Sequence, residues 1–267
     1  MINPITSSPW GFRFHRFHDY CAFMKRIGIR EICTMFGDPA KLPLAFSRVP
    51  SEMDVTEIKK TLNDFGLKII EIAGGGDYLN PESAQREFDI TVEQMRWAQR
   101  IGVKYFRLCD IWPDSEDVFA KISGVIRKLG ESAKKLPFTI IVENHGGIMK
   151  TGKQTRRLME AIGLENVGVN YDPANYAYYG EDPLKTLREI RPFVRFVHFK
   201  NVRFPGGHAE YCRLRDGVID YRTIWPALFP EYRGYVCLEY EKAEDAEIGT
   251  QDDLAYLREI GQGQNAK

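Results

Sequence analysis

Four apolar stretches of the chain end in residues whose side chains are typical metal ligands. The four residues are Glu143 after 138–142, Asp172 after 167–171, His198 within 193–199, and Glu239 after 235–238. Continuous apolar runs are typical of parallel strands buried on both faces. In α/β folds, chemistry gathers at the carboxyl ends of such strands. Any one acid could be an ordinary solvated residue at a strand end, but four at matching positions predict a divalent metal site.

The types of these side chains also narrow the choice of ion. Three carboxylates and one imidazole form a hard, oxygen-rich donor set that suits Mn²⁺, Mg²⁺ or Co²⁺, with Zn²⁺ as a further option. Among these ions, we expect Mn²⁺ to be the native one. A metal next to a carbonyl and its neighbouring hydroxyl would acidify the C–H between them and stabilise the resulting enediolate. Carboxylates beside that carbon could then remove and return a proton, which gives epimerisation or isomerisation.

Three further residues are candidates for contact with a substrate. His145 shares the strand parity of Glu143 and is expected to point into the same mouth, although it could instead bond the following glycine turn. Lys200 shares the parity of His198, so its cation could hold a substrate oxygen or pair with a ligand carboxylate. Trp112 follows another predicted strand and is expected to form an apolar wall or to serve packing.

The segments expected to position these residues repeat one local sequence pattern. Four amphipathic segments close on glycine and pass directly into an apolar stretch, at Gly28, Gly66, Gly102 and Gly163. Glycine adopts the left-handed conformation that ends a helix at little cost. The recurrence of this short connection is typical of βα units.

The units add up to a single (β/α)8 TIM barrel over residues 1–260, followed by a flexible tail at 261–267. The other strands are expected within 2–14, where prolines interrupt the pattern, and at 31–35, 68–73 and 104–109. Helices are expected at 54–65, from an N-cap at Asn80 to Gly102, and at 115–136, 151–162, 182–191 and 250–260. A doubly wound open sheet is the alternative, which fits less well because four successive strands deliver ligands to one place.

Composition excludes several classes of protein. Lys+Arg and Asp+Glu both number 37, which leaves no net basic charge for nucleic-acid binding. The 5 cysteines have no close pairs, so we expect them to be buried and reduced. No signal peptide or apolar run of membrane-spanning length is visible. A cytoplasmic protein without nucleic-acid or membrane partners is therefore expected.

The ordered set Glu143, Asp172-Pro173, His198-x-Lys200 and Glu239 resembles that of the xylose-isomerase-like barrel superfamily of sugar isomerases and epimerases. The likeness extends over nearly the whole chain. It is similar to the pattern of D-tagatose 3-epimerase, hydroxypyruvate isomerase and inosose-processing enzymes. The resemblance implies one divalent ion held by Glu143, Asp172, His198 and Glu239, with Glu143 and Glu239 as the catalytic acid/base pair.

The resemblance also suggests two further substrate contacts and marks departures from the family pattern. Arg213 lies in the loop before the last strand, where family members often place a substrate-binding residue. Asn175 stands where many relatives carry a histidine, and Asn201 stands where many carry an aspartate. Cys33 lies near a position that is commonly glutamate. These departures, together with the neutral charge, disfavour the multi-metal apurinic endonucleases of the same barrel.

The expected function is that of a divalent-metal-dependent isomerase or epimerase acting on a small ketose or keto-polyol. A metal-dependent dehydratase of a cyclic keto-polyol, such as inosose or 3-dehydroshikimate, is the alternative within the family. Two others are the isomerase-like subunit of a C-glycoside-cleaving complex and a non-catalytic barrel that binds a ligand or partner. Barrels of this kind often form dimers or tetramers, so a homo-oligomer is compatible with the sequence.

Overall fold

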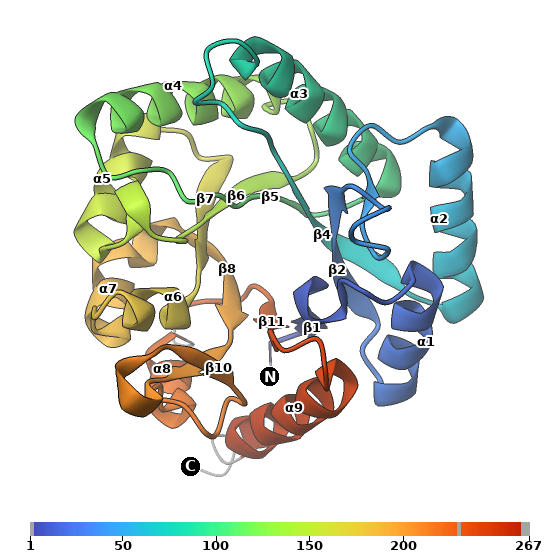
Figure 1. The fold of residues 1–267 in the computed structure, drawn as a ribbon, viewed down its shortest axis with the longest axis vertical. Coiled ribbons are helices and arrows are strands. Elements are labelled where there is room, and N and C mark those ends of the chain that lie inside the picture. The colour runs from blue at the N-terminus through green and yellow to red at the C-terminus, as the bar shows by residue number, and fades with distance from the viewer. Residues whose placement is uncertain (1–2, 229–230, 263–267) are drawn as a thin grey trace.

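A ring of parallel strands forms the centre of the computed structural model, which describes residues 3–228 and 231–262 (Figure 1). Within these residues, 9 strands form one sheet in the order β1-β11-β8-β7-β6-β5-β4-β2-β3. The neighbouring strands of this sheet pair in parallel, as expected for a TIM barrel. The strands are β1 Ile5–Ser7, β2 Glu31–Gly37, β3 Phe46–Ser47, β4 Lys68–Gly74, β5 Tyr105–Leu108, β6 Thr139–Glu143, β7 Val167–Tyr171, β8 Val194–Phe199 and β11 Val236–Leu238. The predicted barrel is therefore confirmed.

The ring closes between β1 and β2. Thr6 on β1 places its Oγ1 3.4 Å from Sγ of Cys33 on β2. The hydroxyl of Tyr20 donates to the carbonyl oxygens of Ser7 on β1 and Cys33 on β2, at 2.8 and 3.3 Å. Because β1 also pairs with β11, it joins β2 to β11, and we call these two contacts of β1 the seam of the ring.

Helices surround the ring on its outer side (Figure 1). They are α1 Phe17–Ile27, α2 Glu52–Phe65, α3 Ala84–Ile101, α4 Glu116–Ser132, α5 Gly152–Ile162, α6 Pro173–Tyr178, α7 Pro183–Ile190, α8 Tyr221–Leu228 and α9 Ala246–Gln262. Single 3-10 turns are η1 Trp10–Phe12, η2 Gly147–Met149, η3 Arg191–Phe193 and η4 Pro205–Gly207. The four predicted glycine ends are confirmed: α1, α2, α3 and α5 stop at glycines with φ of 83°, 66°, 94° and 62°.

Several element boundaries differ from the sequence expectations. α3 begins only at Ala84, after Ser83, whereas the helix was expected to start at Asn80; Asn80 caps the turn before it, since its side chain accepts from the Glu82 amide. The sequence analysis missed β3, the helices α6 and α8, and an antiparallel hairpin of β9 Asn201–Arg203 and β10 Glu210–Cys212. The last helix starts earlier than expected and includes Gly261 and Gln262, while the rest of the predicted tail, 263–267, lies outside the described residues.

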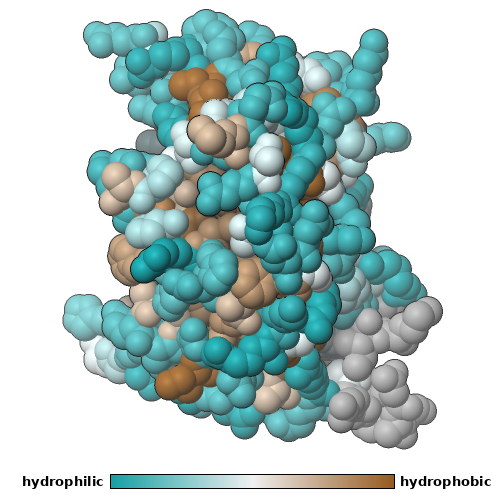
Figure 2. Space-filling view, turned by 90° about the vertical axis from the view of Figure 1, so that its right-hand side faces the viewer, coloured by the Kyte–Doolittle hydropathy of each residue, from teal (hydrophilic) through white to brown (hydrophobic). Residues whose placement is uncertain are grey.

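Apolar side chains fill both the barrel interior and the layer between strands and helices. Inside the ring, Ile141, Phe196 and Cys237 form part of a small separate cluster beneath the mouth. The side carrying α1 and α2 is mainly hydrophilic at its surface, with apolar side chains exposed in small groups (Figure 2). None of the described helices is both long and apolar enough to cross a membrane.

The cysteines are all free thiols, in agreement with the prediction, but one of them is not buried. Cys109 is exposed, because it follows the end of β5 and lines the mouth of the barrel rather than the core. Cys33 and Cys237 approach within 3.7 Å through their sulfur atoms in the barrel interior.

Candidate metal centre

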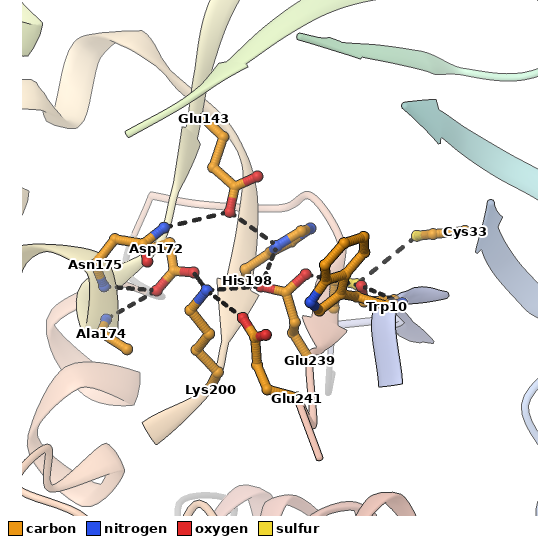
Figure 3. A network of polar contacts seen from close by, with 12 residues as sticks. Trp10, Cys33, Glu143, Asp172, Ala174, Asn175, His198, Lys200, Glu239 and Glu241 are labelled. Carbon is orange, nitrogen blue, oxygen red and sulfur yellow. Dashed lines mark hydrogen bonds and ion pairs between the residues drawn. The ribbon is translucent and has the colours of Figure 1, made fainter. Parts of the chain in front are cut away.

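The structure brings Glu143, Asp172, His198 and Glu239 together at the carboxyl end of the barrel (Figure 3). All four are buried, and one potential ligand atom from each lies within 4.8 Å of the others. They come from β6, β7, β8 and β11 or from the residue that follows, and these strands are consecutive in the ring.

The ladders stagger these side chains step by step around the ring. Glu143 is paired with Asn170, two residues before Asp172. His198 is likewise paired with Cys237, two residues before Glu239. Strands in a barrel tilt, so residues at one height advance in register from strand to strand. The polar residues at successive strand ends therefore meet at one level.

Asp172 is fixed by its position as the N-cap of α6. Its Oδ1 accepts the amides of Ala174 and Asn175 at 2.8 and 3.2 Å, and Pro173 occupies the first turn of the helix. Asn144 adds two hydrogen bonds to the Asp172 backbone, each 2.8 Å long. These contacts use one carboxylate oxygen and leave Oδ2 directed at the cluster.

The two glutamates are held by side chains from neighbouring strands. Ser8, just after β1, donates to Oε1 of Glu239 at 2.7 Å. Arg107 on β5 donates to Oε2 of Glu143 at 2.5 Å, and Asn175 lies 3.4 Å from its Oε1. Nδ1 of His198 lies between the two acids, 3.5 Å from Glu143 and 3.1 Å from Glu239.

The cluster has the size and the unsatisfied atoms that a divalent cation requires. Ligands on opposite sides of an ion such as Mg²⁺ are about 4.2 Å apart, and the four atoms here span at most 4.8 Å. Among the described residues, Oδ2 of Asp172 and both ring nitrogens of His198 are buried without a hydrogen-bond partner. Buried polar atoms are rarely left unpaired. Carboxylate oxygens and imidazole nitrogen are suitable ligands, so the residues fit the ion.

The electrostatics of the cluster also favour a cation. Burial raises the pKa of Asp172 to about 7, although the Lys200 ammonium opposes this shift. Burial alone would also raise the pKa of Glu143 and Glu239, but nearby positive charges, His198 among them, hold both values below the ordinary range. Burial disfavours the charged His198 ring, yet the two glutamates raise its pKa well above its usual value. A bound cation would replace that proton.

Lys200 supplies positive charge beside the acids. Its Nζ lies 3.2 Å from Asp172 and Glu239 and 2.8 Å from Glu241. The salt bridge weighed as the alternative role of Lys200 is therefore present, and the side chain also lines the cavity above the cluster.

This cavity has a volume of about 800 Å³. Trp112 and His145 line it, and their contact with a substrate stays a prediction. The loops that carry Trp112 and His145 approach each other closely at Gly147. Its backbone has a φ of 52°, and a Cβ atom there would lie only 1.7 Å from the Trp112 carbonyl oxygen. Only glycine permits this close approach of backbones.

Two other predicted substrate contacts lie elsewhere. Asn175 is buried and reaches Glu143 rather than the cavity wall. Arg213 does not line the cavity; it pairs with Asp252 and lies 3.7 Å from Asp245. The placement gives no support to substrate binding by Arg213, and we leave it out of the proposed contacts.

The sequence analysis missed the supporting residues. Arg107 bridges Glu143 and Glu71, with 2.8 Å between its Nε and the Glu71 carboxylate. Both Arg107 and Glu71 interrupt apolar strands, and a charge within a buried strand is costly unless it is paired. That interruption was the available signal. Glu241, which shares strand parity with Glu239, could have been inferred in the same way.

Known proteins resemble this chain in sequence. The sequence profile of the xylose isomerase-like TIM barrel family matches residues 21–260. An inosose dehydratase of Lacticaseibacillus casei is 24% identical over 145 residues, which cover 48% of this chain and 49% of that protein. The chain thus spans about half the length of the curated relatives it matches first.

Solved structures resemble this one over nearly its whole length. A xylose isomerase-like TIM barrel protein from Mycobacterium smegmatis, in complex with magnesium, superimposes with a TM-score of 0.79 at 17% identity and covers 98% of this chain and 97% of its own. An L-ribulose 3-epimerase superimposes with a TM-score of 0.78 at 16% identity, covering 99% and 96%. At these identities the likeness establishes the fold alone.

Proposed function

The chain belongs to the xylose isomerase-like TIM barrel family, and from this premise we propose that it is a divalent-metal-dependent isomerase or epimerase of a small ketose or keto-polyol. The observation that carries the proposal is the pairing of Glu143 and Glu239 around His198, beside Oδ2 of Asp172, which faces the Lys200 ammonium at 3.2 Å. Glu143, Asp172, His198 and Glu239 would hold one ion, with Mn²⁺ preferred. A bound ion would polarise a substrate carbonyl and its neighbouring hydroxyl, and so stabilise an enediolate.

The chain's own residues would move the proton. The low pKa values of Glu143 and Glu239 keep both carboxylates ionised, which is the form a general base needs. They extend from the two outer strands of the ligand set, β6 and β11. One carboxylate would remove the proton from the substrate carbon. Epimerisation then requires the opposite carboxylate to have taken a proton from solvent, which it gives to the other face of that carbon, whereas transfer by the first carboxylate of its captured proton to the adjacent carbon gives isomerisation.

Other cavity residues would bind and orient the substrate. Lys200 and His145 present polar atoms at the wall, while Trp10 and Trp112 would exclude water from the reacting carbon. A water-poor site strengthens each electrostatic contact.

The experiment that tests this proposal has two stages. The first is metal content by elemental analysis of the purified protein beside the His198→Ala variant, with thermal stability measured on adding Mn²⁺, Co²⁺ or Zn²⁺. We expect about one ion per chain, lost in the variant. The second is NMR detection of deuterium exchange into ketoses in D₂O. Absence of metal and of any stabilisation would refute the proposal.

Dehydratase activity is the second candidate function, and the charge and position of Lys200 favour it. Its ammonium lines the cavity 3.2 Å from Asp172 and Glu239, and neighbouring carboxylates raise its pKa well above its usual value, although burial opposes this, so the group stays charged and could hydrogen-bond to a departing hydroxide. The inosose dehydratase relatives are consistent with this chemistry. Growth of the ultraviolet absorbance of a conjugated enone would identify the lyase, whereas exchange without that absorbance would identify the isomerase or epimerase.

A further inference from the structure

The cavity has two chemically different halves. The candidate ligands come from β6, β7, β8 and β11, which we call the chelating half of the ring. The opposite strands β5, β4 and β2, with the loops that follow them, form what we call the apolar half. Its apolar cavity-lining side chains include Met35, Phe36, Leu42, Tyr78, Leu108 and Ile111.

We infer that the substrate carries a neutral, apolar group of aromatic size, which binds in the apolar half while its hydroxy-ketone part reaches the chelating half. This inference rests on the proposed function, because the metal centre is what fixes the position of the hydroxy-ketone.

The volume of the cavity is the first argument. At about 800 Å³ it lies within the range that accommodates drug-sized ligands. A free monosaccharide occupies on the order of 200 Å³, scaled from the roughly 30 Å³ that one water takes in the liquid. A small ketose held at the metal would therefore leave most of the cavity to solvent.

The chemistry of the walls is the second argument. Hydroxyl groups placed against Met35, Phe36 or Leu108 would lose hydrogen bonds to water without gaining others, which is costly. An apolar group would instead gain from burial there. Ile111 and Trp10 stand at the cavity with 53% and 40% of their surface exposed, and a bound apolar group would cover them.

The charges on the apolar half argue against an anionic group. Arg48, its cation at the cavity wall, donates to Glu87 at 2.5 Å and to the carbonyl oxygen of Gly75 at 3.2 Å. The pair packs against Gly76, where a Cβ atom would lie 2.4 Å from the Glu87 carboxylate. Since Glu87 neutralises Arg48, the pair offers little net positive charge to a phosphate or carboxylate.

The remaining acids of the apolar half also argue against an anionic group. Asp77 accepts the backbone amides of Leu79 and Asn80, at 3.0 and 3.2 Å. Asp110 accepts the amide of Ile111 at 2.8 Å. Both acids line the cavity and would repel an anion. A neutral group therefore fits this half best.

The test compares two hydroxy-ketones that differ in one substituent. Methyl and phenyl 3-keto-β-D-glucopyranoside present the same ketone and flanking hydroxyls, so both reach the metal equally. Isothermal titration calorimetry on the Mn²⁺-loaded protein measures their dissociation constants. We expect the phenyl compound to bind at least about tenfold more tightly, because its ring removes more apolar surface from water.

A matched pair of variants locates the effect. Ile111→Ser removes an apolar side chain at the cavity, and Ile248→Ser removes one of similar exposure, 60% against 53%, from α9 outside it. Both are exposed, so folding does not depend on them. Ile111→Ser should weaken the phenyl compound about three- to tenfold and leave the methyl compound within about twofold. Ile248→Ser should change neither.

Three results would overturn the inference: equal binding of the two compounds, no binding of either by metal-loaded protein, or a preference for phenyl that Ile111→Ser leaves unchanged. Failure of the proposed function is distinguished beforehand by metal content and the His198→Ala variant. A protein that binds metal and shows deuterium exchange with ketoses, yet lacks the phenyl preference, refutes this inference alone.

Discussion

Arg107 is the residue whose removal tests the electrostatic reasoning about the site most directly. Arg107 is 6% exposed, and its guanidinium holds the buried carboxylates of Glu71 and Glu143. In the Arg107→Met variant, a side chain of related shape replaces this cation and leaves both acids without it. Breaking a buried ion pair from one side costs about 3–5 kcal/mol of unfolding free energy. We expect a loss of that order at pH 7 in protein freed of metal with EDTA.

The loss should depend on pH in a defined direction. Burial already raises the pKa of Glu71, against the opposing charge of Arg107, so without Arg107 the folded protein should keep this carboxyl protonated near neutrality. In the unfolded chain the same carboxyl ionises near pH 4.3. The folded state then binds more protons, and its stability falls by about 1.4 kcal/mol per pH unit until the folded pKa is passed. Between pH 6 and 8 this amounts to about 2.7 kcal/mol.

Urea unfolding of wild type and variant at pH 6, 7 and 8 measures this. The difference between the two proteins is the relevant quantity, because other buried acids titrate in both. Arg157→Met is the matched control, since Arg157 pairs with Glu116 through two contacts of 2.6 Å at the surface. Surface pairs contribute about 0–1 kcal/mol. A loss for Arg107→Met as small as that of the control, or one independent of pH, would refute the reasoning.

Three further predictions concern the acids and the lysine. Glu143→Gln and Glu239→Gln should each lower turnover more than about 10³-fold if both move protons, and near-normal turnover in either variant would remove it from the acid/base pair. Lys200→Ala should reduce substrate binding or turnover while elemental analysis still finds the metal; unchanged kinetics would assign Lys200 a purely structural role. Burial raises the pKa of Asp253 to about 7, so ionisation above pH 4 costs stability, and Asp253→Asn should stabilise the protein at pH 8 by on the order of 2–4 kcal/mol. The gain should shrink towards pH 5 in urea unfolding, and a gain that grew instead would contradict the burial effect.

Features set by local physics could be predicted from the sequence. The strands that carry Glu143 and His198 were recognisable because burial on both faces removes the alternation of polar residues. Gly66 and Gly163 marked helix ends because the left-handed conformation is a property of the residue itself. By contrast, α6 has only 6 residues, too few to show a helical period, so Asp172 was predicted as a ligand but not also as an N-cap.

The contacts around the candidate ligands could not be predicted, because they depend on which strands become neighbours. Arg107 meets Glu71 since β5 pairs with β4, and it meets Glu143 since β5 also pairs with β6. Arg213 lies in a loop whose path is set by a hairpin that no short motif indicated. Its charge was visible in the sequence, but its partners, Asp252 on α9 and Asp245 just before it, were not.

The seam of the ring has a consequence for how the site comes into being. Ser8 donates to Glu239 across 231 positions of sequence, and β1 pairs with β11. During synthesis, β1 must therefore remain without β11 until residue 238 has been made. Contacts of such high sequence separation form slowly. If Glu239 is a metal ligand as proposed, its support by Ser8 is acquired at a late step of folding, and the uptake of an ion by refolding protein would time the pairing of β1 with β11.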